Sequence, residues 1–187
     1  WMERISFQFR FYDVLRLDHF RGFDSYYAIP AAAETAKEGS WEPGPGIAFF
    51  RSMERVVGQR PIIAEDLGFL TPSVQKLLED TGYPGMKVLE FAFDSRDTSN
   101  YLPHTYPRHC VCYTGTHDNM TTRQWLETGT PEMKKYATEY MRLDETEGLV
   151  WGVIRTAMSS VSDTCVIPLQ DYLDLGAEAR MNIPGTT

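Results

Sequence analysis

Residues 14–23 read VLRLDHFRGF, and this stretch decides how the chain is expected to fold. Its first half is apolar enough for a strand, and its second half carries charged and aromatic residues around a glycine. Because side chains alternate along a strand, Arg16 and Asp18 are expected on one face and His19 on the other. A carboxylate beside a guanidinium therefore ends a predicted strand. Such a pair can fix a loop or belong to an active site, and this stretch alone favours neither reading.

The pattern of an apolar strand followed by an acid occurs twice more. Residues 61–68, PIIAEDLG, place Glu65 after a short apolar run, and residues 109–119, HCVCYTGTHDN, place Asp118 after another. The connection between residues 19 and 46 is long and rich in aromatic residues, and loops of this length are usually functional or mobile. Periodicity and turn residues predict further strands at 86–93 and 165–169, and helices at 1–12, 47–57, 71–81, 130–141 and 149–161.

Strands that alternate with helices imply parallel strands joined by helical crossovers. The predicted fold class is therefore α/β, of the (β/α)8 TIM-barrel type. A complete barrel has eight strands in about 250 residues, whereas this chain of 187 residues shows about five such units. Residues 1–187 are accordingly expected to be the C-terminal portion of one catalytic barrel domain, truncated at both ends.

The composition excludes several classes of protein. Hydrophobic residues make up 42% of the chain and charged residues 24%, which is typical of a globular protein. The net charge of −8 argues against a nucleic-acid partner. No apolar run approaches the roughly 18 residues of a membrane helix, and no secretory signal begins the chain. A cytoplasmic location is expected, or a plastid one if a targeting peptide lies upstream. The three cysteines are expected to be reduced core thiols.

The acids at three strand ends suggest a reaction. If the strands close into a barrel, Asp18, Glu65 and Asp118 converge on one rim, where barrel enzymes carry their active sites. A single strand-end acid is more often structural than catalytic, but three in succession favour a site. Two converging carboxylates suit the cleavage of glycosidic bonds. Asp18, beside Arg16, is expected to be the ionised nucleophile. Glu65 is preceded by apolar residues and is expected to be the acid/base.

The four histidines, His19, His104, His109 and His117, do not have the spacing of a metal site. Hydrogen bonding to substrate hydroxyls, or structural pairing, is the expected role.

Five ordered blocks, at residues 16–23, 64–68, 82–89, 113–119 and 180–185, resemble those of the 4-α-glucanotransferases, or amylomaltases, which are relatives of the α-amylases. The resemblance implies retaining transfer of α-1,4-glucan segments between maltooligosaccharides through a covalent glycosyl-enzyme intermediate, with no metal and no organic cofactor. It also implies that Asp18 is the nucleophile, Glu65 the acid/base and Asp118 the acid that stabilises the transition state. Substrate-binding positions are implied at Arg16, His19, Phe91, His117 and Asn182.

Two positions depart from the family pattern. Met120 stands where many members carry another acid, and Glu90 stands where many carry glutamine; both bear on subsite preference. The N-terminal half of the family's catalytic domain is expected to be missing, so the chain alone is expected to be inactive or prone to aggregation. The alternatives are a hydrolytic glycosidase of the α-amylase type and a non-catalytic glucan-binding module.

Overall fold

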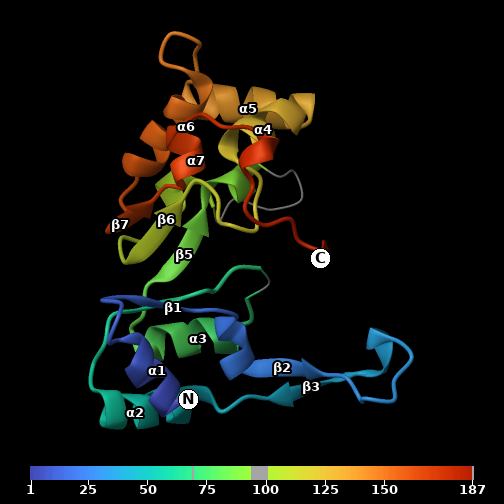
Figure 1. The fold of residues 1–187 in the computed structure, drawn as a ribbon, viewed down its shortest axis with the longest axis vertical. Helices are drawn as coiled ribbons and strands as arrows, with labels where there is room; N and C mark the ends of the chain where they lie inside the picture. The colour runs from blue at the N-terminus through green and yellow to red at the C-terminus, as the bar shows by residue number, and fades with distance from the viewer. Residues whose placement is uncertain (69, 94–100, 187) are drawn as a thin grey trace. The chain divides into compact units, whose positions relative to one another are not determined.

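A computed structural model describes residues 1–68, 70–93 and 101–186. The chain forms two compact units, residues 1–86 and 87–187, and both contain helices and strands (Figure 1). Each of the five strands expected from the sequence contains a strand in the structure, although the observed strands are shorter. The described residues include no helix that is long and apolar enough to cross a membrane.

The first unit is built around two parallel strands. In chain order its elements are α1 (Met2–Gln8), β1 (Leu15–Leu17), β2 (Ser25–Ala28), β3 (Ser40–Pro43), α2 (Gly46–Val57), β4 (Ile62–Ala64) and α3 (Pro72–Thr81). Strands β1 and β4 pair in parallel, with Leu15 opposite Ile62 and Leu17 opposite Ala64. The predicted parallel arrangement is confirmed for this pair, so the two strands end on the same side.

Local sequence signals set the ends of helix α3. The Thr71 hydroxyl accepts a hydrogen bond from the Val74 N–H, and Pro72 occupies the first helical position. Gly82 ends the helix with φ at +66°, a conformation that favours glycine. Val74 and Leu77 of this helix are buried in the core of the first unit. The other buried members of this core are Ile5, Leu17, Phe20, Phe23, Phe50, Met53, Ile62 and Ala64.

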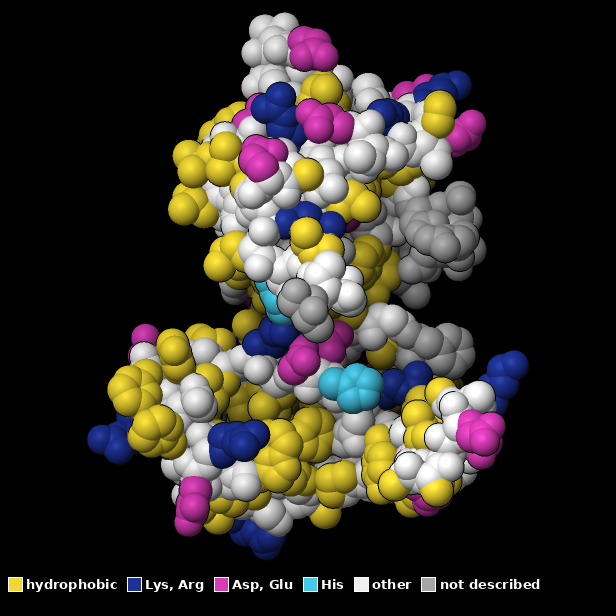
Figure 2. All heavy atoms as spheres, turned by 45° about the vertical axis from the view of Figure 1, so that its right-hand side comes forward, with side chains coloured by type: hydrophobic (Ala, Val, Ile, Leu, Met, Phe, Trp, Pro, Cys, Tyr) yellow, Lys and Arg dark blue, Asp and Glu magenta, His cyan; other side chains and the backbone are white. Residues whose placement is uncertain are grey.

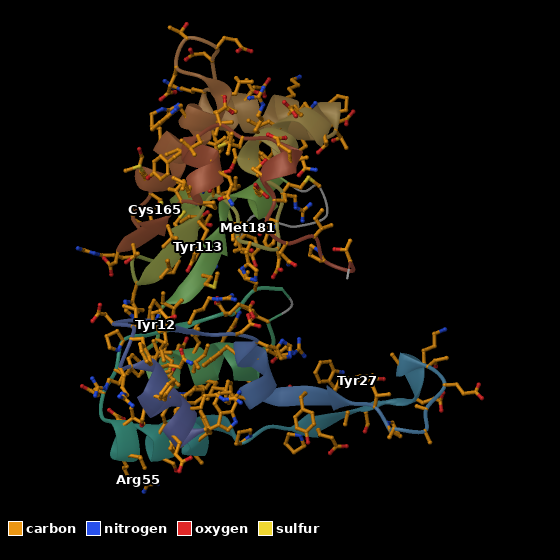
Figure 3. The ribbon with its side chains drawn as sticks, viewed as in Figure 1. Tyr12, Tyr27, Arg55, Tyr113, Cys165 and Met181 are labelled. Carbon is orange, nitrogen blue, oxygen red and sulfur yellow. The ribbon has the colours of Figure 1, made fainter. Side chains whose placement is uncertain are left out.

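The long connection after residue 19 contains regular structure that the sequence did not predict. Strands β2 and β3 form an antiparallel hairpin in which Tyr27 lies opposite Trp41 (Figure 3). The Arg21 guanidinium lies 4.3 Å from the centre of the Trp41 ring, a cation–π contact. The residues of β3 are all exposed. Without a buried face there is no alternation of apolar and polar residues, so periodicity could not reveal this hairpin.

The second unit contains a sheet in the order β5-β6-β7. Its elements are β5 (Gly85–Val88, which begins at the end of the first unit), β6 (Cys110–Tyr113), α4 (Thr122–Thr128), α5 (Pro131–Met141), α6 (Leu149–Met158), β7 (Thr164–Val166) and α7 (Leu169–Tyr172). Strands β6 and β7 are parallel, and Cys112 lies opposite Cys165 (Figure 3). All three cysteines are free thiols, two of them buried.

Two expectations for the second unit are corrected. The predicted strand at 86–93 ends at Val88, and residues Leu89–Phe93 form a 3-10 helix. Four of those five residues are buried, and a short run that is buried on all sides does not distinguish a strand from a helix by its pattern. Helices α4 and α7 were not expected, because each is short and lacks a long apolar period.

Candidate active site

Asp18 lies just beyond β1 and is paired with an arginine of that strand. The Arg16 Nη2 atom is 2.9 Å from Asp18 Oδ1. The Asp18 side chain is 75% exposed and that of Arg16 only 29%. The expectation that Arg16 and Asp18 share one face is confirmed by this ion pair. The carboxylate is thus oriented by a partly buried cation while it remains open to a substrate.

His19 interrupts the strand alternation immediately after Asp18. Its φ and ψ of 49° and 51° are left-handed, an uncommon conformation for a residue other than glycine. Gly22 packs closely against the His19 ring in this turn, because a Cβ atom at position 22 would lie 2.9 Å from His19 Cδ2. Unusual backbone conformations of this kind cluster at functional sites. This turn directs the His19 N–H towards the carboxylate of Glu65 at 2.7 Å.

Glu65 follows β4 and is bound to the backbone on two sides. Its Oε2 accepts the bond from His19, and its Oε1 accepts one from the Leu67 N–H at 2.9 Å. The Glu65 N–H donates to the Leu17 carbonyl at 2.9 Å. Glu65 therefore stands next to the residues that follow β1. Backbone amides of two turns thus contact the carboxyl group of Glu65, which follows an apolar run in the sequence.

Asp66, the next acid, has a structural role. Its side chain is buried, and Oδ1 accepts a hydrogen bond from the Met86 N–H at 2.6 Å. A Cβ atom on Gly85 would lie 2.5 Å from Asp66 Oδ2, so the start of β5 packs directly on this carboxyl group. In the sequence, Asp66 is the like charge that directly follows Glu65. The structure separates them: Glu65 lies at the strand end, and Asp66 joins β4 to β5.

In the second unit Asp118 lies in the loop between β6 and α4. Its Oδ1 accepts a hydrogen bond from Asn182 Nδ2 at 2.6 Å, and its Oδ2 is 3.4 Å from His117 Nε2. The Asp118 carbonyl accepts a bond from the Arg180 guanidinium at 3.2 Å. Three of the predicted site residues are therefore together here. Met181, between the two partners of Asp118, marks their segment in Figure 3.

The loop around Asp118 is closed by its own side chains. Asn119 Oδ1 accepts hydrogen bonds from the Thr116 N–H at 2.9 Å and from the Thr116 hydroxyl at 2.7 Å. The Asn119 N–H donates to the Thr116 carbonyl at 3.1 Å. This tight turn presents His117 and Asp118 outwards, where both side chains are more than half exposed.

Phe91 and Glu90 lie on the 3-10 helix that follows β5. Phe91 is half-buried, and its ring packs edge-on against Tyr101 with 5.4 Å between the ring centres. Burial raises the pKa of Glu90 well above its usual range; the charge of Asp171 raises it further, and Arg180 opposes the shift. Glu90 Oε1 has no hydrogen-bond partner among the described residues. The raised pKa and the unpartnered oxygen both favour the neutral form of Glu90.

The described part of the chain contains no group of three or more His, Cys, Asp or Glu residues that could hold a metal ion. In the first unit, the exposed carboxylate of Asp18 and the half-buried carboxylate of Glu65 follow two parallel strands. In the second unit, the carboxylate of Asp118 accepts a hydrogen bond from Asn182. Acids at the ends of parallel strands are typical of barrel enzymes, and paired carboxyl groups suit the cleavage of glycosidic bonds.

A comparison with known proteins gives the family. The family model described as 4-alpha-glucanotransferase matches residues 1–187, and the chain belongs to this family. It is 48% identical over its whole length to the 4-alpha-glucanotransferase of Clostridium butyricum. It is 44% identical over 186 residues to the chloroplastic/amyloplastic 4-alpha-glucanotransferase of Arabidopsis thaliana, of which it covers 32%. The cytoplasmic location expected from the sequence thus stays a prediction.

Solved structures agree with this family. The amylomaltase from Streptococcus agalactiae, solved in complex with acarbose, matches all of this chain with a TM-score of 0.93 and 43% sequence identity. The amylomaltase from Corynebacterium glutamicum has the same fold, with a TM-score of 0.76 at 20% identity over the whole chain and 32% of its own. The chain spans 38% of the length of the Clostridium butyricum and Streptococcus agalactiae proteins.

Proposed function

We propose that residues 1–187 belong to the catalytic domain of an enzyme that transfers α-1,4-glucan segments from one maltooligosaccharide to another. The observation that carries this proposal is the ordered pair of carboxylates, with Asp18 held by Arg16 and Glu65 held beside it, in a chain of the 4-alpha-glucanotransferase family. A non-catalytic binding module would not need these acids to be oriented.

The proposed reaction has two steps. In the first, Glu65 gives its proton to the glycosidic oxygen while the Asp18 carboxylate attacks the anomeric carbon, so that a glycosyl ester of Asp18 forms and the reducing-end fragment leaves. In the second, Glu65 removes the proton of an acceptor hydroxyl, which attacks the same carbon and releases Asp18. Two inversions retain the α configuration. Water in place of the acceptor would give hydrolysis.

The other predicted residues support these steps. We assign to Asp118 the stabilisation of the positive charge that develops on the sugar ring. His19 and His117 are proposed to bind the hydroxyls of the reacting glucose, and Phe91 to contact a neighbouring sugar. We propose that Asn182, whose amide donates to Asp118, also orients that acid.

We further propose that the strands belong to an eight-stranded barrel completed by a longer chain. The match to 38% of the Streptococcus agalactiae amylomaltase supports this. So do the large hydrophobic side chains exposed on the first unit (Figure 2). They include Trp1, Phe7, Phe11, Tyr12, Val14 and Val56, each about half exposed or more.

The proposal is tested with a chimera in which residues 1–187 replace the matching segment of the Clostridium butyricum 4-alpha-glucanotransferase. The chimera is incubated with maltotriose, and the products are resolved by chromatography. We expect glucose together with oligosaccharides longer than maltotriose. Glucose and maltose alone would indicate a hydrolase, and a folded chimera without products would contradict the proposal.

A further inference from the structure

Asp171, on helix α7, is one of the most deeply buried charged residues of the second unit. Its relative exposure is 2%, and the threonines that contact it, Thr114 and Thr122, are both at 0%. Asp171 Oδ2 accepts hydrogen bonds from the Thr114 hydroxyl at 2.6 Å and from the Thr122 hydroxyl at 2.9 Å. Oδ1 accepts a third from the Thr122 N–H at 2.8 Å. Both carboxyl oxygens of Asp171 are thus satisfied by hydrogen bonds from the two threonines.

The two threonines lie at the two ends of the loop that carries Asp118. Thr114 directly follows β6, and Thr122 is the first residue of α4. Between them run residues 115–121, which include His117 and Asp118. One buried carboxylate thus binds both ends of this loop.

The segment that holds Asp118 from the other side also begins at α7. Gln170 Nε2 donates to the Ala179 carbonyl at 3.3 Å, next to Arg180. Arg180 and Asn182 then contact the backbone and side chain of Asp118. The loop and the residues that bind its acid therefore share one anchor, the helix that carries Asp171.

A buried charge is expensive unless it is compensated, so its surroundings matter. Glu90 and Arg180 lie near Asp171: the charge of Asp171 raises the pKa of Glu90, and the charge of Arg180 lowers it. The three hydrogen bonds from the two threonines offset part of the cost of burying the Asp171 carboxyl group. The burial of Asp171 is explained if its hydrogen bonds keep the loop 115–121 in a fixed position.

We propose that Asp171 is a positioning residue for glucan transfer: its carboxylate ties both ends of the loop 115–121 and so sets where Asp118 stands against the substrate. This rests on the proposed function, in which Asp118 stabilises the transition state. Asp171 itself touches no reacting atom. An acid displaced by about 1 Å can lose on the order of 100-fold in rate.

The test is Asp171→Asn in the full-length chain, which keeps the side-chain volume but places an amide N–H₂ against the threonine donors. We expect kcat for maltotriose disproportionation to fall about 10- to 100-fold with KM within about twofold. Hydrogen–deuterium exchange of peptides covering 115–121 should become faster. The matched control is Asp174→Asn, the same change at a half-exposed site beyond α7, which should leave kcat within about twofold of the parent.

The outcomes separate the two proposals. Parental kcat and parental exchange in Asp171→Asn would overturn the positioning role. If Asp171→Asn loses its cooperative thermal transition, a second variant, Thr114→Val, provides the test. It removes one hydroxyl donor to Asp171 and should lower kcat several-fold at constant KM. Full activity of Thr114→Val would overturn the positioning role. An Asp118→Asn variant with parental activity would contradict the proposed function itself. An inactive Asp118→Asn beside a fully active Asp171→Asn would contradict only the inference.

Discussion

The acids of the two units are held in different ways. In the first unit, Asp18 is paired with Arg16, two residues earlier, whereas Glu65 accepts from Leu67, two residues further on, and from His19, 46 residues earlier. In the second unit, the partners of Asp118 are 62 and 64 residues away, in Arg180 and Asn182. The pairing of Asp18 is therefore local in the chain, whereas Asp118 depends on how distant segments pack.

This difference has a consequence for how each acid responds to change. A locally held acid stays oriented as long as its strand and turn form, so its loss is felt mainly in the chemistry. An acid held by a distant segment is also lost when that segment shifts. Substitutions remote from Asp118 should therefore affect the proposed reaction more than substitutions remote from Asp18.

The largest effect is expected from the locally held nucleophile. Asp18→Asn removes the attacking carboxylate and should lower kcat for maltotriose disproportionation by about 10⁴-fold or more. Because Arg16 and Glu65 remain, the melting temperature should change little. Steady-state rates and a thermal melt measure both quantities. Asp13→Asn, an exposed acid before the same strand, is the control, and a comparable loss there would refute the assignment of Asp18.

A smaller effect is expected from the remote partner of Asp118. Asn182→Ala removes the N–H donor at 2.6 Å from Asp118 Oδ1 and should lower kcat about 10-fold with little change in KM. If Asn182 instead serves mainly to bind the ground-state substrate, KM rises and kcat is kept. Initial rates over a range of maltotriose concentrations distinguish the two cases, and the second would weaken the contrast between the units.

The smallest effect concerns the stability of the second unit. The folded-state pKa of Glu90 is raised, so the folded chain binds a proton that the unfolded chain releases above its ordinary carboxyl pKa. Stability should therefore fall as the pH rises from about 4.3 towards the raised folded-state pKa of Glu90. Glu90→Gln, which stays neutral, should raise the melting temperature by a few degrees near pH 7 and leave it unchanged near pH 4.

Thermal melts across this pH range measure the effect. The control is Glu178→Gln, an exposed carboxyl group of the same unit, which should not remove the decline. A Glu90→Gln variant with the same pH dependence as the parent would show that Glu90 does not carry it.

Much of the fold could be predicted because its signals are local. The Thr71–Pro72 start and Gly82 end of α3 are set by hydrogen bonds and backbone angles within one turn. The hairpin of β2 and β3 and the short helix α7 escaped prediction for the opposite reason. Their residues lack a buried periodic face of sufficient length, so only their packing partners define them.

The candidate site likewise has a part that local signals predict and a part that only tertiary packing defines. Alternation along a strand was enough to put Arg16 beside Asp18, because the period of a strand is a property of its backbone. Glu65 was expected at the strand end because of the apolar run before it, but the structural role of Asp66 could not be read from the sequence. That depends on Met86 and Gly85 arriving from the next strand to enclose Asp66.

By itself, the sequence determined the strand-and-acid pattern, the family resemblance and the local pairing at Asp18. The tertiary structure alone decided that Asp171 ties the Asp118 loop and that Arg180 and Asn182 hold its acid. The physical reason is the range of the interactions. Turns, caps and strand alternation act over a few residues, whereas a buried carboxylate finds its donors only after segments about 50 residues apart have packed together.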